Sequence, residues 1–185
     1  EGNKFESKFK DYIKKDIISL VVNFVDLLAH KSSQTNVLKE MMQDESAFRS
    51  AVKIWFEHSW LLKVLKQLSE QKFTVIITSD HGSTRVNNSV MVSADKAASS
   101  GVRYKYGRNL NTNEKNALVI KDPKEYRLPI FGPQPSYLIA KEDYYFIYPN
   151  EANKYHAKFK NSFQHGGISM QEMFIPVVIL KSKNS

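Results

Sequence analysis

Two mainly apolar runs in the chain are each followed by an acidic residue. Residues 17–25 precede Asp26, and residues 73–78 precede Asp80 with one serine between them. Runs of this length, rich in β-branched residues, are typical of strands that are buried on both faces. The pattern therefore predicts two strands of a main sheet, with a carboxylate at the end of each.

The region between these runs has a helical pattern. Apolar positions recur at helical spacing over residues 33–72, with a predicted break at residues 44–46. A strand, a mainly helical segment and a second strand form a βαβ unit, whose two strands are expected to be parallel. A charged stretch at residues 4–15 carries aromatic residues at near-helical spacing and predicts a further helix.

The chain changes character after the second run. Residues 86–160 are rich in Asn, Gly, Pro and Tyr and predict a β-rich insertion or cap within one domain of residues 1–185. Short apolar runs predict four strands in this region, at residues 90–92, 117–120, 136–139 and 144–148.

The last part of the chain carries a helix signal followed by a strand signal. Ser169 and Glu172 have the spacing of a capping box, which begins a short helix. Residues 174–180 predict the last strand of the main sheet. The predicted fold class is α/β, with a mainly parallel sheet flanked by helices and an antiparallel β insertion.

The composition narrows the choice of partner and compartment. The chain has 27 Lys and Arg against 19 Asp and Glu, and the net charge of +8 suits an anionic partner such as a phosphorylated small molecule, a nucleic acid or an acidic protein. The absence of cysteine excludes disulfides, a thiolate nucleophile and a Cys-type zinc site. No apolar run approaches the roughly 20 residues of a membrane span, and we predict a cytoplasmic location.

Candidate metal ligands follow both predicted strands. Asp26 and His30 are four residues apart, which places them on one face if a helix begins there. Asp80 and His81 follow the second strand, and His165 stands in a loop with two glycines. Five nitrogen and oxygen donors without sulfur fit two metal ions, with Zn²⁺ as the first choice and Mn²⁺ as the second. A pair of such ions suits phosphoryl transfer.

Each candidate ligand also has a simpler interpretation. Asp26 is suited to cap a helix, and Asp80 to begin a turn. His30 is equally consistent with a solvated helix residue, and His165 with a loop residue bonded to backbone. The metal interpretation depends on their joint occurrence at matching positions of the predicted sheet.

The sequence around these residues resembles that of a known family. Asp-x-x-x-His, Asp-His-Gly and a distant His-Gly-Gly resemble the ligand set of the alkaline phosphatase superfamily. The longer matches resemble its PglZ domain, most closely that of PorX-type response regulators of the type IX secretion system, over about residues 18–180. These matches are residues 23–26, 78–82, 103–109 and 163–170.

The resemblance implies an assignment of ligands and an alkaline-phosphatase-like fold. Asp26, His30 and His165 would bind one zinc ion, and Asp80 and His81 the other. The superfamily also uses a Thr or Ser nucleophile and an earlier Asp ligand, and residues 1–25 contain no Thr and no matching Ser. We therefore expect this chain to be the carboxyl-terminal part of one such domain, with the nucleophile upstream and a receiver domain in the same polypeptide.

A cluster of cations is the candidate substrate contact. Arg103, Lys105 and Arg108 alternate with Tyr104 and Tyr106. Arg offers a bidentate fork to phosphate and Lys a point charge. The resemblance supports this role, and a solvated basic hairpin is the alternative.

Two functional hypotheses follow. The first is a zinc-dependent phosphohydrolase domain, a phosphodiesterase for nucleotide or oligonucleotide substrates. The second is a non-catalytic signalling or docking module that keeps the fold and the metals and meets an acidic partner protein.

Overall fold

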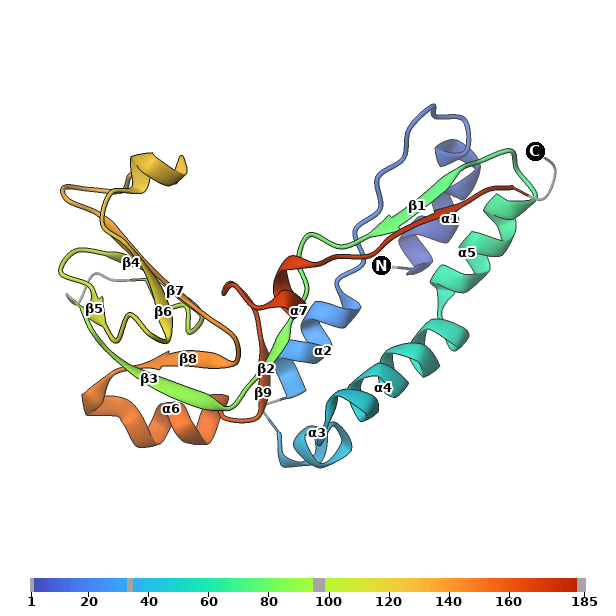
Figure 1. Cartoon of the computed structure of the whole chain (residues 1–185). Coiled ribbons are helices and arrows are strands. Elements are labelled where there is room, and N and C mark those ends of the chain that lie inside the picture. The colour runs from blue at the N-terminus through green and yellow to red at the C-terminus, as the bar shows by residue number, and fades with distance from the viewer. Residues whose placement is uncertain (1, 33–34, 95–98, 183–185) are drawn as a thin grey trace. The chain divides into compact units, whose positions relative to one another are not determined.

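The computed structural model describes residues 2–32, 35–94 and 99–182 (Figure 1). The chain divides into two compact units. The helical unit comprises Glu1–Leu27, Met42–Thr78 and Pro176–Ser185, and the β-rich unit comprises Leu28–Met41 and Ser79–Ile175.

Three helices form most of the helical unit. They are α1 (Gly2–Tyr12), α4 (Glu45–His58) and α5 (Trp60–Ser69). Asp44 caps α4 by accepting a 2.8 Å hydrogen bond from the backbone of Ala47. This cap is the physical cause of the helix break predicted at residues 44–46, and that prediction is confirmed.

Aromatic side chains hold these helices together. Phe5 of α1 lies 5.9 Å from the ring of Trp60, and Phe24 stacks on Trp55 with 4.2 Å between ring centroids. Gly2 packs so closely on Trp60 that a Cβ there would overlap with the indole. Large rings contribute much of the packing energy of a small unit.

The strands of the helical unit differ from the sequence-based expectation. β1 (Val75–Thr78) pairs with β10 (Val177–Leu180) in an antiparallel ladder, Val75 opposite Leu180. The apolar pattern predicted burial on both faces, yet Ile76 is 62% exposed and Val177 is 63% exposed. The prediction of full burial for residues 73–78 is therefore wrong in the described structure, and its partner β10, predicted only as the last strand, is exposed as well.

The first predicted strand is also wrong. Residues 17–23 belong to no strand, and helix α2 (Phe24–Ser32) begins where the strand was expected to end. The Asn23 carbonyl already accepts a 3.0 Å helical hydrogen bond from Leu27. An apolar run shows that a segment favours burial, but it does not show whether a neighbouring strand is available for pairing.

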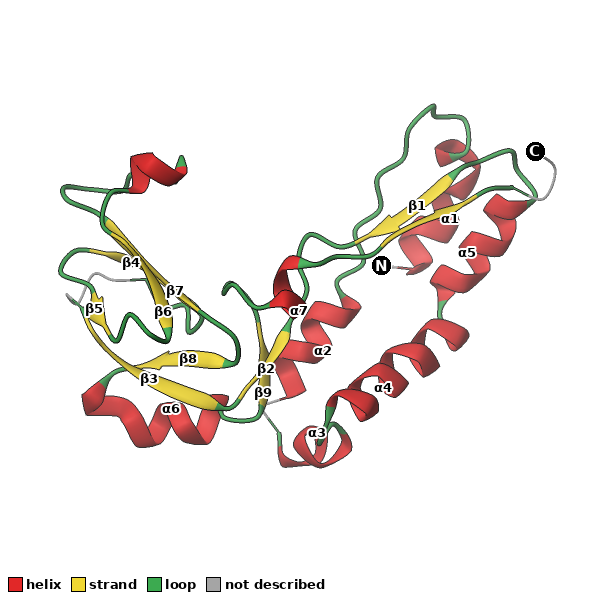
Figure 2. Cartoon of the chain, viewed as in Figure 1, coloured by secondary structure: helices red, strands yellow, loops and turns green. Residues whose placement is uncertain are grey.

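The β-rich unit contains the remaining elements (Figure 2). The boundary between the units falls within α2. The strands are β2 (Thr84–Val86), β3 (Asn88–Ser93), β4 (Tyr104–Gly107), β5 (Asn111–Thr112), β6 (Ala117–Ile120), β7 (Ser136–Ala140), β8 (Tyr144–Ile147) and β9 (Ser162–Gln164). The helices are α3 (Asn36–Met41), η1 (Pro123–Tyr126), η2 (Pro149–Glu151), α6 (Ala152–Phe159) and α7 (Met170–Met173).

These strands form three small sheets. Their orders are β2-β9, β5-β3-β8 and β4-β7-β6. β3 and β8 run parallel, with α6 against β8, whereas the other strand pairs of the described residues are antiparallel (Figure 1). The chain is mixed α/β, but the mainly parallel sheet predicted from the sequence is not found in the described part.

The predicted strands of the β-rich region are confirmed as β3, β6, β7 and β8. Alternate residues of these strands build its core, which includes Val90, Leu138 and Phe146 at 4% exposure or less. The domain prediction, with an insertion over residues 86–160, stays a prediction, and residues 95–98 of that range lie outside the described residues.

Within the described segments, no helix combines the length and hydropathy that a membrane crossing requires.

Candidate metal centre

Helix α2 carries the first two candidate ligands. Asp26 and His30 both lie within Phe24–Ser32, so the helical i, i+4 spacing predicted from the sequence is present. Asp26 is exposed in the first turn, where the helix dipole favours a negative charge. His30 is half-buried in the last turn.

His165 meets His30 through their ring nitrogens. The two Nε2 atoms lie 3.1 Å apart. Two nitrogens on one tetrahedral zinc ion, each about 2.0–2.1 Å from the metal, stand roughly 3.3 Å apart. The two imidazoles therefore fit a single ion, and Asp26, one turn before His30 in the same helix, is a further candidate ligand.

A contact with the neighbouring backbone orients the ring of His81. Its Nδ1 lies 2.9 Å from the carbonyl oxygen of Gly82, and a carbonyl accepts a hydrogen bond only if Nδ1 carries the proton. In the neutral ring, Nε2 then keeps its lone pair. This Nε2 lies 3.7 Å from the exposed carboxylate of Asp80. Asp80 and His81 thus offer two donors at one place.

Two glycines allow the loops of these histidines to approach other backbone closely. A Cβ on Gly82 would overlap with the carbonyl oxygen of Gln171 in α7. Gly166, which follows His165, has φ +102°, and a Cβ there would lie 2.8 Å from the ring of Tyr104. These positions require glycine, as the sequence indicated for the His-Gly-Gly loop.

A buried ion pair lies behind both loops. Arg103 and Glu172 are buried, and a nitrogen of Arg103 lies 2.5 Å from a carboxylate oxygen of Glu172. Burial alone raises the pKa of Glu172, but hydrogen bonds from Arg103 and Ser169 outweigh burial and hold the pKa below its ordinary value.

Ser169 adds a second set of contacts to this ion pair. The predicted capping box at Ser169 and Glu172 is confirmed, because each side chain binds the backbone of the other.

The predicted phosphate-binding residues lie in different environments. Arg103 and Lys105 are both fully buried, whereas Arg108 is exposed. The Nζ of Lys105 donates a 3.0 Å hydrogen bond to the carbonyl of Ser99 and lies 4.6 Å from the ring centre of Tyr148. Burial lowers the pKa of Lys105 to about 8. The phosphate-binding role of these three residues stays a prediction. The contacts of Arg103 support a structural role for this residue.

Glu172 is the residue whose importance the sequence did not reveal. Its capping-box spacing was visible, but nothing local indicated that Arg103, far away in the sequence, would pair with it. Its position shortly after His165 was the one further signal in the sequence.

Comparison with known proteins identifies the family of the chain. The family model described as the BREX system PglZ alkaline phosphatase-like domain matches residues 6–180, which is nearly the whole chain. No curated protein matches the chain. The family match indicates a phosphohydrolase-type domain. The chain therefore belongs to the PglZ family of alkaline phosphatase-like domains.

Proposed function

We propose that this chain is part of a zinc-dependent phosphodiesterase that acts on nucleotide or oligonucleotide substrates. The observation that carries the proposal is the 3.1 Å approach of the Nε2 atoms of His30 and His165 in a PglZ-family chain. Imidazole and carboxylate donors without sulfur suit zinc first and manganese second.

The candidate ligands would bind two metal ions. Asp26, His30 and His165 would hold one ion, and Asp80 and His81 would hold the other. A bound zinc ion supplies Lewis-acid polarisation of a phosphoryl oxygen. The hydrogen bond from His81 to the Gly82 carbonyl would fix the ring so that Nε2 faces the ion.

The exposed cation Arg108 would attract and orient the phosphate. Its guanidinium offers a planar fork that matches two phosphate oxygens. The net charge of +8 would raise the encounter rate with an anionic substrate.

The wider setting is also part of the proposal. The chain would serve as the output domain of a cytoplasmic PorX-type response regulator for type IX secretion, with a receiver domain in the same polypeptide. The sequence matches at residues 103–109 and 163–170 support this assignment.

The test combines metal analysis with a phosphodiesterase assay. Zinc content is measured first, because it does not depend on turnover. Hydrolysis of bis-p-nitrophenyl phosphate is then followed for this chain and for any longer natural polypeptide that contains it. Bound zinc and turnover that Asp80→Ala or His81→Ala abolishes would support the enzyme.

The same experiment separates the two functional hypotheses. Bound zinc without turnover in either polypeptide would favour the docking module with an acidic partner protein. A protein that binds no zinc would overturn the zinc-dependent enzyme.

A further inference from the structure

The buried pair of Arg103 and Glu172 connects both loops that carry candidate ligands. Its two side chains are 0% and 2% exposed, so neither reaches a substrate in solvent. Arg103 Nε donates a 3.0 Å hydrogen bond to Glu172 Oε1, and a terminal nitrogen of Arg103 binds Oε2. The contact is therefore bidentate, which fixes the orientation of both groups.

The Glu172 carboxylate holds the loop after His165. Oε1 accepts a 2.9 Å hydrogen bond from the backbone of Gly167. Oε2 accepts hydrogen bonds of 3.0 and 2.6 Å from the backbone and the hydroxyl of Ser169. A carboxylate that meets this many donors has little freedom to move, and neither has the loop that supplies them.

The backbone of the same residue holds the other loop. The carbonyl oxygen of Glu172 accepts a 2.9 Å hydrogen bond from the backbone nitrogen of Gly82, the residue directly after His81. Glu172 thus contacts the Asp-His-Gly loop through its main chain and the His-Gly-Gly loop through its side chain.

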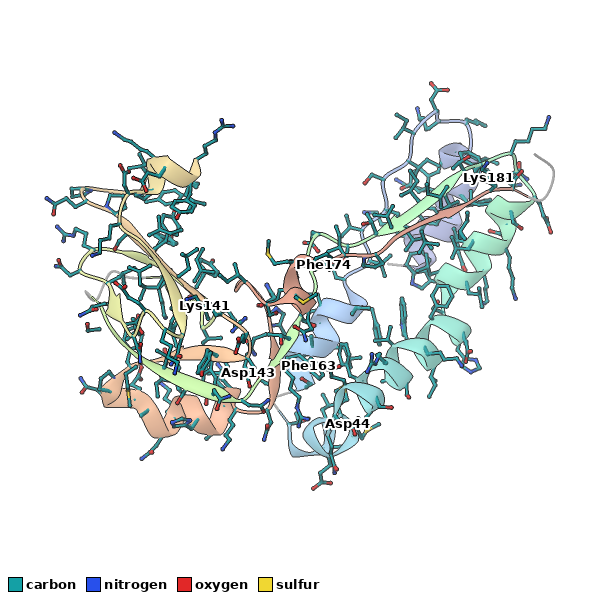
Figure 3. The ribbon with its side chains drawn as sticks, viewed as in Figure 1. Asp44, Lys141, Asp143, Phe163, Phe174 and Lys181 are labelled. Carbon is teal, nitrogen blue, oxygen red and sulfur yellow. The ribbon has the colours of Figure 1, made fainter. Side chains whose placement is uncertain are left out.

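Arg103 anchors this arrangement to the sheet of β4 and β7. Its guanidinium donates to the carbonyl oxygens of Lys141 and Glu142 in the β7–β8 turn and of Tyr144, the first residue of β8. Lys141 and Asp143 mark this turn in Figure 3. The Arg103 carbonyl also accepts a 2.8 Å hydrogen bond from Ala140 of β7. The pair is therefore fixed to a regular element and not only to loops.

We propose that Arg103 and Glu172 are positioning residues, which set the relative placement of His81 and His165 for metal binding. This inference rests on the proposed metal function of those histidines. A buried ion pair adds little to stability compared with apolar residues of the same volume. Outer partners of metal ligands typically change metal affinity about 10–100-fold.

Glu172→Gln tests this role, with Co²⁺ as a coloured probe for the site. The amide keeps the size of the side chain but replaces one carboxylate oxygen with an NH₂ group. This group donates hydrogen bonds, so it cannot accept those from Arg103 or Ser169. We expect Co²⁺ to bind about 10–100-fold more weakly, and its visible spectrum, which reports ligand geometry, to shift. Glu151→Gln is the matched control, because Glu151 forms an exposed pair with Lys154 in the same unit. It should bind Co²⁺ like the wild type.

A second variant covers the case in which Glu172→Gln does not fold. Ser169→Ala removes one donor to the Glu172 carboxylate and leaves the ion pair in place. It should weaken Co²⁺ binding several-fold and shift the spectrum in the same direction.

The outcomes separate this inference from the proposed function. A wild-type protein that binds no Co²⁺ or Zn²⁺ would overturn both. Wild-type binding together with unchanged affinity and spectrum in folded Glu172→Gln, or in Ser169→Ala if the first variant is unfolded, would overturn only the positioning role.

Discussion

The ring of His81 stacks on the ring of His165, with 4.0 Å between centroids and 16° between ring planes. The two residues are assigned to different zinc ions by the family resemblance. Their stacking brings ligands of both predicted sites side by side in the β-rich unit. Metal sites that share a phosphoryl substrate need such neighbouring ligands.

Removal of one imidazole at this contact should weaken metal binding. His165→Ala takes away the ring that faces both His30 and His81. We expect zinc affinity to fall by more than about 100-fold, since even an outer partner of a ligand is worth about 10–100-fold. Competitive titration with a chromophoric chelator measures this. His58→Ala, at an exposed helix end, is the control and should retain wild-type affinity. Equal affinities of both variants would contradict the assignment of His165.

A side chain at Gly82 should disturb the site through the backbone. In Gly82→Ala the new Cβ would overlap with the Gln171 carbonyl, so the Asp-His-Gly loop or α7 must shift. We expect the free energy of unfolding to fall by up to about 3 kcal/mol, with weaker zinc binding. Urea denaturation and chelator titration measure the two effects.

Gly132→Ala separates strain from displacement of the site. Gly132 has φ +74°, and a Cβ there would meet nothing within 4 Å. The free energy of unfolding should fall by about 1 kcal/mol, because the new side chain disfavours this backbone conformation. Zinc affinity should stay unchanged. If Gly82→Ala also leaves zinc affinity unchanged, the packing of Gly82 on α7 does not position His81.

The buried amine of Lys105 should make stability depend on pH in the alkaline range. Burial lowers its pKa from 10.5 to about 8 in the folded protein. Between these values the unfolded chain binds more protons, so the free energy of unfolding should rise with pH through Lys105.

Lys105→Met should remove that rise. Urea unfolding of both proteins is compared at about pH 7 and about pH 9, where most tyrosines are still protonated. The wild type should gain stability relative to the variant at the higher pH. A constant difference between the two proteins would show that Lys105 does not titrate in this window.

Substrate contact is expected from the exposed cation of the basic cluster. Arg108→Ala should weaken binding of a non-hydrolysable phosphodiester analogue about tenfold, which corresponds to one charge-assisted hydrogen bond. Thermal stability should change little because the side chain is exposed. Arg49→Ala, which removes an exposed cation of α4, serves as the control. An effect of the same size in both variants would indicate only a general charge effect.

Local signals predicted most elements of this fold. The capping residue Asp44, the capping box at Ser169 and the short apolar run of β7 act through neighbours in sequence, and each element formed as expected. The helical spacing of Asp26 and His30 was recognisable for the same reason.

Pairing between distant segments could not be predicted in this way. The apolar run at residues 17–25 indicated a strand but carried no information on a partner. The antiparallel pairing of β1 with β10 depends on the path of the intervening chain. The ion pair of Arg103 with Glu172 joins residues far apart in sequence, and neither position alone indicates burial of a charge.

The zinc content of the wild-type chain tests the central claim most directly. The bound metal is first removed with a chelator, and the protein is then reloaded with excess Zn²⁺ and dialysed. Its zinc content is measured by inductively coupled plasma mass spectrometry. The account predicts two zinc ions per chain, with Asp26→Asn lowering the content. A wild-type chain that retains no zinc after reloading would contradict it.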